Sequence, residues 1–261
     1  MKRIGIIGFG TMGEAFAAGL RRTMPDVAIS VFEVRSERAD AARSMGLSVA
    51  RAAGEVLEAA DITILCVKPQ DFPSLAAEAR ESARGGKIVS IMAGKTIQTI
   101  SEGLGVDQVA RFMPSLAAVK GTSLVGISFG PGAGKEFQAE CVSIAHALGA
   151  PLEIPEKLMS AMTGISGSGL AYVFAFVHAM ALGGVAAGFD YPTALRVAVA
   201  GLEGAASLLK GGGHPMELAS RVTSPAGTTI QGVRALERGG FTAAVMEAVE
   251  AAARKATELE G

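Results

Sequence analysis

The chain is short of cysteine, tryptophan and histidine. It contains two cysteines, no tryptophan and three histidines among 261 residues. Two thiols are too few for a disulfide framework, and neither a C-x-x-C pair nor a histidine cluster is present to bind a metal ion. We therefore predict no metal site and a reducing setting, the cytoplasm.

Charge is also scarce and balanced. Charged residues make up 19% of the chain and the formal net charge is −1. Nucleic-acid-binding proteins carry a basic surface, so this composition argues against that class and against an acidic interaction tail. Hydrophobic residues make up 49% of the 261 residues, enough for two domains or for one large domain with a full core. Small apolar partners or self-association fit this composition better.

One long stretch has no charge at all. Residues 164–189 contain no Asp, Glu, Lys or Arg and are long enough to cross a membrane. Serines, glycines, Tyr172 and His178 interrupt the stretch, and no second such span follows. We therefore expect a helix buried between subunits instead of a membrane anchor.

The beginning of the chain has a glycine-rich motif directly after a strand-like run. Residues 3–7 read as a buried strand, and the G-x-G-x-x-G motif follows at residues 8–13. In such motifs Gly8 permits a tight turn, Gly10 lets the backbone approach a pyrophosphate, and Gly13 lets the helix pack closely on its strand. The alternative interpretation is a strand–helix turn without a ligand.

The context favours a dinucleotide site. The helix that begins at Thr11, with Met12 in its first turn, offers free N–H groups and the positive end of its dipole to phosphates. Glu33 ends the next apolar run, where an acidic residue binds the adenosine ribose hydroxyls. A carboxylate there repels a 2′-phosphate and favours NADH, whereas the nearby Arg35 and Arg38 leave NADPH open.

Residues 1–154 are predicted to form an α/β, Rossmann-like domain, because short apolar runs alternate with amphipathic segments as in parallel sheets. The expected strands are 4–7, 28–32, 62–67, 88–91, 109–112 and 124–127, and the expected helices begin near residues 11, 37, 53, 72, 96 and 134. Residues 155–261 show only helical spacing and predict an all-α domain. This domain has too many apolar positions to bury alone, so we expect a homodimer or larger assembly.

Two loops at the carboxyl ends of expected strands are further candidates for cofactor contacts. Val67-Lys68-Pro69 follows one strand, and Lys68 either faces the cofactor phosphates or is a solvated lysine. Ala93-Gly94 follows the next strand, where small residues let a nicotinamide ribose approach the backbone.

The helical half contains two motifs of small polar residues. Ser166, in Ile165–Gly169, suits the floor of a pocket for a small polar ligand, or else allows close helix packing. In the segment Ser224–Thr229, Pro225 indicates a first helical turn with Ser224 as its N-cap. The N–H groups of that turn offer a carboxylate site without arginine, unless the segment is only a capped helix.

The order of these motifs resembles that of pyrroline-5-carboxylate reductases along nearly the whole chain. The motifs that carry the resemblance are Gly8–Gly13, Val67-Lys68-Pro69, Met113-Pro114, Ser166-Gly167-Ser168 before Ala171–Phe174, and Ser224-Pro225-x-Gly227-Thr228-Thr229-Ile230. Three places depart from the family pattern: Ser115-Leu116-Ala117, Gly169-Leu170, and Ala226, where the family usually has N-T-P, S/G-P and glycine.

The resemblance implies a helical dimerisation domain like the C-terminal part of 6-phosphogluconate dehydrogenases. It also implies NAD(P)H-dependent reduction of L-1-pyrroline-5-carboxylate to L-proline. The turn that contains Ser224, Gly227 and Thr228 would hold the substrate carboxylate, and Thr229 would hydrogen-bond the ring nitrogen. The departures keep a related cyclic imine open as the substrate.

Two other functions are alternatives. A 3-hydroxyacid dehydrogenase of the same architecture needs a lysine on the helix after its second-domain glycine motif, and residues 169–190 contain none. A sensor that binds NAD(P) without turnover would not need the Ser224–Thr229 turn.

Overall fold

The computed structural model describes residues 1–260, which divide into two compact units. The first comprises residues 1–168 together with the residues from 251 onward, and the second comprises residues 169–250. The boundary between the compact units therefore falls after Ser168, whereas the sequence placed a boundary after residue 154. Helix α12 begins in the second unit and ends in the first.

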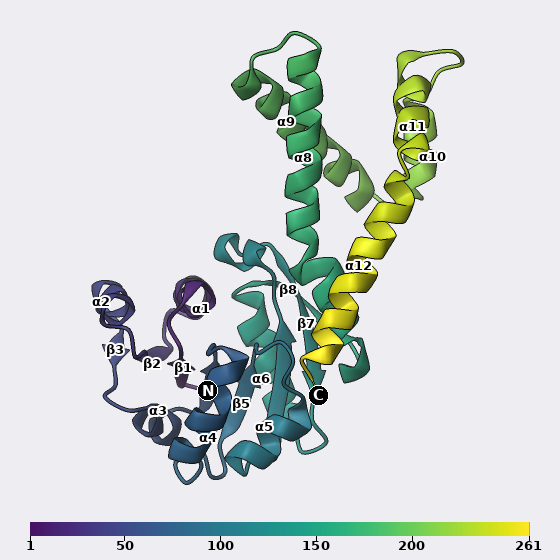
Figure 1. Cartoon of the computed structure of the whole chain (residues 1–261). Helices are drawn as coiled ribbons and strands as arrows, with labels where there is room; N and C mark the ends of the chain where they lie inside the picture. The colour runs from purple at the N-terminus through teal and green to yellow at the C-terminus, as the bar shows by residue number, and fades with distance from the viewer. Residues whose placement is uncertain (261) are drawn as a thin grey trace. The chain divides into compact units, whose positions relative to one another are not determined.

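The first unit is built on an eight-stranded sheet in the order β3-β2-β1-β4-β5-β6-β7-β8 (Figure 1). All neighbouring strands are parallel except β6 and β7, which are antiparallel. The strands are β1 (Arg3–Ile7), β2 (Ala28–Phe32), β3 (Ser48–Val49), β4 (Ile62–Leu65), β5 (Lys87–Ser90), β6 (Gln108–Met113), β7 (Ser123–Phe129) and β8 (Gly149–Glu153).

The six predicted strands are all present, with ends shifted by a residue or two. Two strands were missed, because β3 has only two residues and β8 contains Pro151, which a strand tolerates at the edge of a sheet. The predicted parallel sheet is confirmed, with one antiparallel pair, β6–β7, that the sequence did not indicate. There the chain returns through a short 3₁₀ segment, Leu116–Lys120, instead of the long crossover that a parallel pair requires.

Helices cover both faces of this sheet. The helices of the first unit are α1 (Thr11–Thr23), α2 (Ser36–Ser44), α3 (Ala53–Ala59), α4 (Phe72–Ala79), α5 (Ile97–Leu104), α6 (Lys135–His146) and the short α7 (Met159–Met162). Ile4 and Ile6 of β1 join one buried cluster with Phe16 of α1 and Phe137 of α6, whereas Ile7 joins a second cluster formed with α3, α4 and α5.

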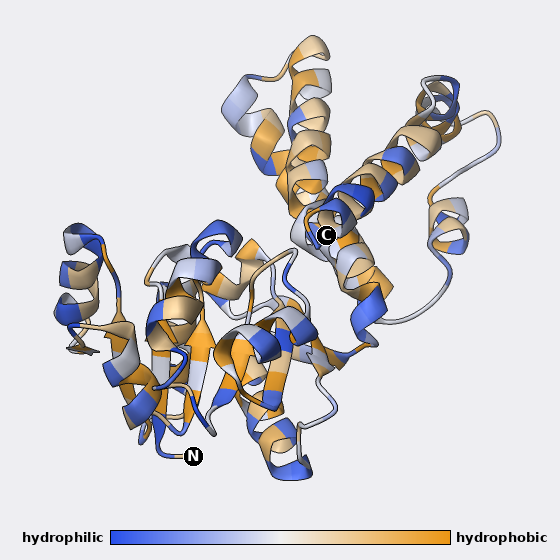
Figure 2. Cartoon of the chain, turned by 60° about the horizontal axis from the view of Figure 1, so that its bottom comes forward, coloured by the Kyte–Doolittle hydropathy of each residue, from blue (hydrophilic) through white to orange (hydrophobic). Residues whose placement is uncertain are grey.

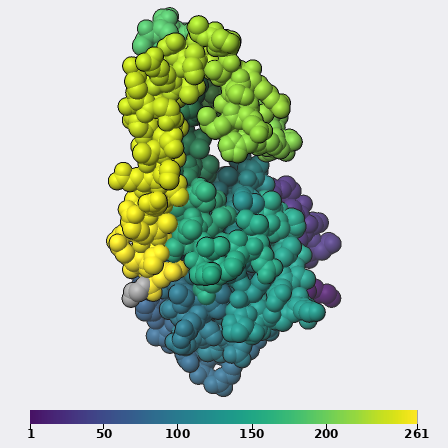
Figure 3. Space-filling view, turned by 90° about the vertical axis from the view of Figure 1, so that its right-hand side faces the viewer, coloured from purple at the N-terminus to yellow at the C-terminus, as the bar shows by residue number. Residues whose placement is uncertain are grey.

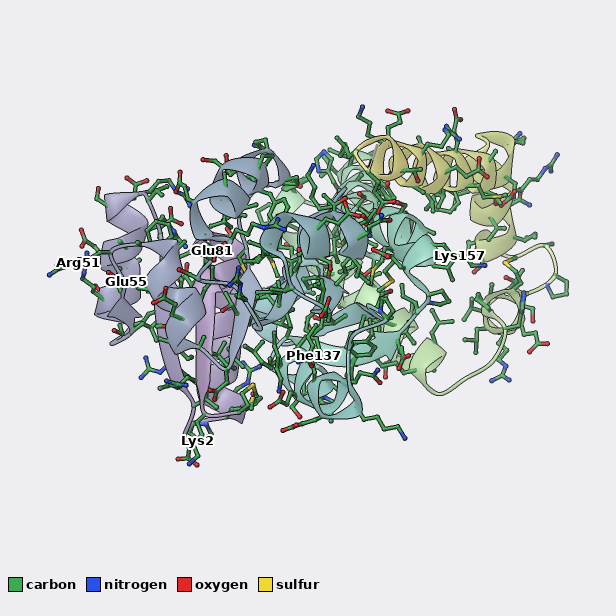
Figure 4. The ribbon with its side chains drawn as sticks, turned by 90° about the horizontal axis from the view of Figure 1, so that it is seen from below. Lys2, Arg51, Glu55, Glu81, Phe137 and Lys157 are labelled. Carbon is green, nitrogen blue, oxygen red and sulfur yellow. The ribbon has the colours of Figure 1, made fainter. Side chains whose placement is uncertain are left out.

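This alternation is what a strand buried on both faces produces, because successive side chains point to opposite sides. The strands at the centre of the unit are accordingly hydrophobic in Figure 2, and the outer helix surfaces are hydrophilic. Phe137 of α6, labelled in Figure 4, is fully buried.

The second unit is entirely helical. It contains α8 (Gly169–Ala186), α9 (Tyr191–Lys210), α10 (Pro215–Arg221), α11 (Thr228–Arg238) and most of α12 (Phe241–Glu258). Helices α8 and α9 pack on each other, and the Tyr172 hydroxyl donates to the Ala248 carbonyl at 3.1 Å. The Phe176 and Phe241 rings lie 5.9 Å apart.

Much of α8 is apolar and uncovered within one chain. Only Val177 and Ala181 of its eighteen residues are buried, and Phe174 is 59% exposed. The helical stretch 156–186 is long and apolar enough, by length and composition, to cross a membrane, a test that core helices of soluble proteins also pass. Apolar helix faces that one chain leaves uncovered are typical of interfaces between subunits.

Candidate cofactor site and carboxylate-binding turn

A cavity of about 580 Å³ lies at the carboxyl ends of β1, β2, β4 and β5. Strand β1 has β2 on one side and β4 on the other, so the order of the strands reverses here. In open α/β sheets ligands bind at this switch point. The cavity is lined by Gly8, Gly10, Thr11, Met12, Phe32, Glu33, Val34, Arg35, Cys66, Val67, Lys68, Pro69, Asp71, Ile91, Met92 and Ala93.

The glycines at residues 8–13 shape the floor of this cavity. Gly8 has φ +93°, and a Cβ there would lie 2.8 Å from the Cys66 carbonyl oxygen. A Cβ on Gly13 would lie 2.2 Å from the Gly8 carbonyl oxygen, so the first turn of α1 rests directly on the loop. Only glycine fits at either position.

Gly10 leaves the opening of the cavity clear. It is the N-cap of α1, and no side chain accepts a hydrogen bond from the first turn of that helix. The nearest atom to a Cβ on Gly10 would be Arg35 Nη2, at 3.7 Å. The unpaired N–H groups at the start of α1 are thus free to bind an anion such as a pyrophosphate.

Glu33 is held as a carboxylate at the end of β2. Its Oε2 accepts a hydrogen bond from the Phe9 N–H at 2.7 Å, and its Oε1 accepts from the Arg35 N–H and Nε at 3.0 and 3.1 Å. Burial alone would raise the pKa of Glu33, but the hydrogen bonds from Arg35 and Phe9 outweigh it and hold the pKa below its ordinary value.

Both arginines near this carboxylate are engaged inside the protein. Arg35 is paired with Glu33. Arg38 donates from Nε to the Phe9 carbonyl at 2.8 Å and from Nη2 to Glu14 at 2.6 Å, and its guanidinium lies 5.9 Å from the centre of the Phe9 ring. An added phosphate would therefore meet guanidiniums that already donate to Glu33, Glu14 and the Phe9 carbonyl.

Most of the predicted cofactor-binding residues meet at the cavity. The exceptions are Gly13 and Gly94, which lie behind its wall instead of lining it. Lys68 is among the residues that line the cavity. Sequence reasoning missed Phe32, Val34, Asp71, Ile91 and Met92, although each lies within two residues of a predicted position. Cys66 also lines the cavity, and burial raises the pKa of its thiol, so it is not a nucleophile at neutral pH.

The second predicted site is the segment before α11, in the second unit. The Gly227 N–H donates to the Ser224 carbonyl at 3.0 Å, and Ala226 between them has φ +58°. Proline second and a positive φ third is the pattern of a type II turn. The expected helix start at Pro225 with Ser224 as N-cap is therefore wrong: α11 begins at Thr228, and Gly227 is its N-cap.

The later start of α11 still leaves backbone N–H groups that can bind a carboxylate. No side chain caps α11, so the N–H groups of its first turn, beginning at Thr228, are available to a carboxylate. A Cβ on Gly227 would lie 2.2 Å from Ser224 Oγ, which shows how tightly the Ser224 side chain folds over the turn. Thr229 is half-buried beside it.

Ser166 lies in the first unit, in a π-helical turn formed by residues 163–167. The Ser168 N–H donates to the Thr163 carbonyl at 2.8 Å, and α8 begins directly afterwards. Single π-helical turns occur frequently at functional sites. Of the three histidines, His178 is exposed and bonded to the Tyr191 hydroxyl at 2.9 Å, and His214 caps α10.

A glycine-rich strand–turn–helix, an uncapped helix N-terminus and a carboxylate at the end of β2 define the dinucleotide-binding half of NAD(P)-dependent oxidoreductases. The family model described as NADP oxidoreductase, coenzyme F420-dependent, matches residues 3–94, and the model for pyrroline-5-carboxylate reductase dimerisation matches residues 156–259. These two matches confirm a Rossmann-like domain followed by a helical dimerisation domain.

Comparison with individual proteins identifies the family. The pyrroline-5-carboxylate reductase of Aquifex aeolicus is 36% identical over 98% of this chain and 97% of its own. A solved structure of the Streptococcus pyogenes enzyme is 30% identical, with a TM-score of 0.89 over 98% of both chains. That of Plasmodium falciparum, with NADP bound, is 24% identical, with a TM-score of 0.91 over 100% of this chain and 98% of its own. The chain belongs to the pyrroline-5-carboxylate reductase family.

Proposed function

We propose that the protein reduces the C=N bond of L-1-pyrroline-5-carboxylate to give L-proline, the last step of proline synthesis, in the cytoplasm and as a homodimer formed through its helical unit. The observation that carries the proposal is the pair of backbone anion sites, one at the start of α1 and one at the start of α11. The first suits a pyrophosphate and the second a carboxylate, which are the anionic groups of the two reactants.

The residues of the first unit fit a bound nicotinamide dinucleotide. Gly8, Gly10 and the first turn of α1 would hold the pyrophosphate, with Lys68 as a nearby cation, and Glu33 would accept hydrogen bonds from the adenosine ribose. The cofactor, when bound, supplies the hydride. Ala93 is small and leaves room beside it for the nicotinamide riboside.

The turn before α11 would orient the imine. The backbone N–H of Thr228 anchors the carboxylate, and Gly227, whose own N–H is bonded to the Ser224 carbonyl, leaves room for it beside the Ser224 hydroxyl. The Thr229 hydroxyl bonds the ring nitrogen. Ser166 of the first unit is a further hydroxyl that the proposal assigns to the substrate. A protonated imine already carries the proton that the product amine keeps, so the chain needs no strong general acid. Its main contribution is to hold two reactants in the correct geometry, which accounts for a large part of many enzymatic rate enhancements.

We also propose that NADH is preferred to NADPH. Glu33 is an anion at the position of the adenosine ribose hydroxyls, and Arg35 and Arg38 are already bonded to Glu33, Glu14 and the Phe9 carbonyl. A 2′-phosphate would meet a carboxylate without gaining a free guanidinium. The Plasmodium falciparum structure holds NADP, but at 24% identity it supports only the fold of this chain and not its cofactor preference.

A spectrophotometric assay tests the function directly. Adding L-1-pyrroline-5-carboxylate to protein and NADH should lower the absorbance of the reduced cofactor, with proline as the product. 1-Pyrroline, which lacks the carboxylate, should react far more slowly, because it cannot use the turn. Cofactor binding without consumption would favour the sensor, and reduction of another cyclic imine alone would reassign the substrate.

Thr229→Val tests the role assigned to the Thr229 hydroxyl. We expect kcat/KM for the imine to fall about 10- to 100-fold, the order of magnitude for a lost hydrogen bond that also orients the substrate. Thr242→Val is the matched control, since Thr242 lies in the same unit and its hydroxyl donates to the exposed Glu237 carboxylate at 3.0 Å. Equal activity of the two variants would remove Thr229 from the site.

A further inference from the structure

The loop that follows β5 forms one wall of the cofactor cavity. Ile91, Met92 and Ala93 line it, and the Met92 N–H donates to Ser90 Oγ at 3.2 Å. Gly94, next in the chain, is buried and has φ +73°. The position of this wall therefore depends on what packs behind Gly94.

Leu259, which directly follows the end of α12, packs there. A Cβ on Gly94 would lie 2.6 Å from both the Cβ and the carbonyl oxygen of Leu259. The Leu259 backbone thus rests on the Gly94 α-carbon, although its side chain is 53% exposed. Figure 3 shows the lower end of α12, in yellow, against the blue surface of the first unit to which these residues belong.

A buried ion-pair network fixes this contact. Arg111 of β6 is 2% exposed and donates to Glu260 at 2.9 Å and to Glu156 at 2.8 Å. Glu156 also accepts from the Ile97 N–H at 2.7 Å, at the start of α5. Arg111 itself stands opposite Ser90 in the β5–β6 register, where the loop begins.

We infer that Leu259 and Glu260 are positioning residues for the cofactor: they hold the loop 91–94 so that Ala93 stands at the correct place for the nicotinamide riboside. The inference rests on the cavity being the cofactor site of the proposed function. Neither residue touches the cavity, since neither is among the residues that line it. The adenosine end of the cofactor, at Glu33 and Gly10, lies on other loops and does not depend on this contact.

The experiment compares two ligands that differ in the nicotinamide riboside. NADH reaches the loop 91–94, whereas ADP carries only the adenosine and two phosphates. For Glu260→Ala we expect the Kd of NADH to rise about five- to tenfold, within what a small displacement at a ligand-positioning loop produces, with the Kd of ADP changed less than about twofold. Gly94→Ala displaces Leu259 without changing any charge. It should likewise raise the Kd of NADH and leave the Kd of ADP nearly unchanged.

Two further variants act as controls. Glu258→Ala removes a carboxylate from the last residue of α12, where it pairs with the exposed Lys255, and should leave both Kd values unchanged. Glu260→Gln keeps an acceptor for Arg111, so its Kd for NADH should lie between that of Glu260→Ala and that of the unchanged protein. The inference is overturned, and the proposed function is not, if Glu260→Ala weakens NADH and ADP binding equally. The same holds if Glu260→Ala weakens NADH binding no more than Glu258→Ala does. Failure of the unchanged protein to bind either ligand overturns the proposed function as well.

Discussion

At the scale of single residues, the proposed preference for NADH rests on Glu33. Glu33→Ser removes the carboxylate and releases Arg35, whose side chain then has a free guanidinium for a 2′-phosphate. We expect the ratio of kcat/KM for NADPH to that for NADH to rise about 10- to 100-fold. Asp40→Asn is the control, because Asp40 pairs with Arg43 on the surface of α2. An unchanged ratio for Glu33→Ser would contradict the NADH assignment.

Ala226 is the only residue other than glycine in the described part of the chain with a positive φ. An alanine in this conformation costs about 1 kcal/mol or more, and glycine does not, although glycine loses more entropy on folding. We expect Ala226→Gly to stabilise the protein by about 0.5 kcal/mol in urea unfolding. Ala244→Gly, in exposed α12, should instead destabilise it by about 1 kcal/mol. If both substitutions lowered the free energy of unfolding by the same amount, the backbone at Ala226 would not be strained.

At the scale of elements, Asp61 joins the starts of β1 and β4. Its Oδ2 accepts from the Lys2 and Arg3 N–H groups at 2.6 and 3.0 Å, and these hydrogen bonds, together with the Arg3 side chain, lower its pKa from 3.8 to about 2. Because the folded-state pKa is depressed, the stability that Asp61 contributes is complete above its unfolded pKa and is lost as the pH falls towards the folded value.

The corresponding measurement is the free energy of unfolding of wild type and Asp61→Asn between neutral pH and pH 2. The wild type should be the more stable above about pH 4, and the difference should shrink steadily between pH 3.8 and about 2. Asp40→Asn is again the control, because it removes a surface carboxylate that pairs with the Arg43 side chain. A difference that does not vary with pH would show that the hydrogen bonds of Asp61 are not linked to its charge.

The accuracy of sequence reasoning also varies by element. The strand–turn–helix at residues 3–23 was predictable because its signals are local: an apolar run, three spaced glycines and a helix start. The edge strands β3 and β8 were not, since one is two residues long and the other contains Pro151. The start of α11 was misplaced because Pro225 suits the second position of a turn as well as the first turn of a helix.

The site shows the same limit. The residues that line the cavity lie in or beside recognisable sequence motifs. Where a lining residue was missed, a residue next to it or two positions away had been predicted. The contact of Leu259 with Gly94, and that of Glu260 with Arg111, join residues more than a hundred positions apart. Such pairs leave no local pattern, and only the folded chain reveals them.

At the scale of the whole molecule, the uncovered face of α8 predicts association. Phe174→Glu places a charge on an apolar side chain that is 59% exposed within one chain. We expect this variant to be monomeric by sedimentation and to lose most of its activity, because a buried unpaired charge at an interface is strongly unfavourable. Val119→Glu changes an exposed apolar residue of the first unit and should remain assembled. A wild type that sediments as a monomer would contradict the expectation.

The helical unit is an insertion: the polypeptide leaves the sheet unit after Ser168 and re-enters it at Ala251. Both ends of the helical unit are therefore joined to the sheet unit by the chain itself. A single proteolytic cut inside the helical unit would leave each of its two pieces covalently attached to the sheet unit.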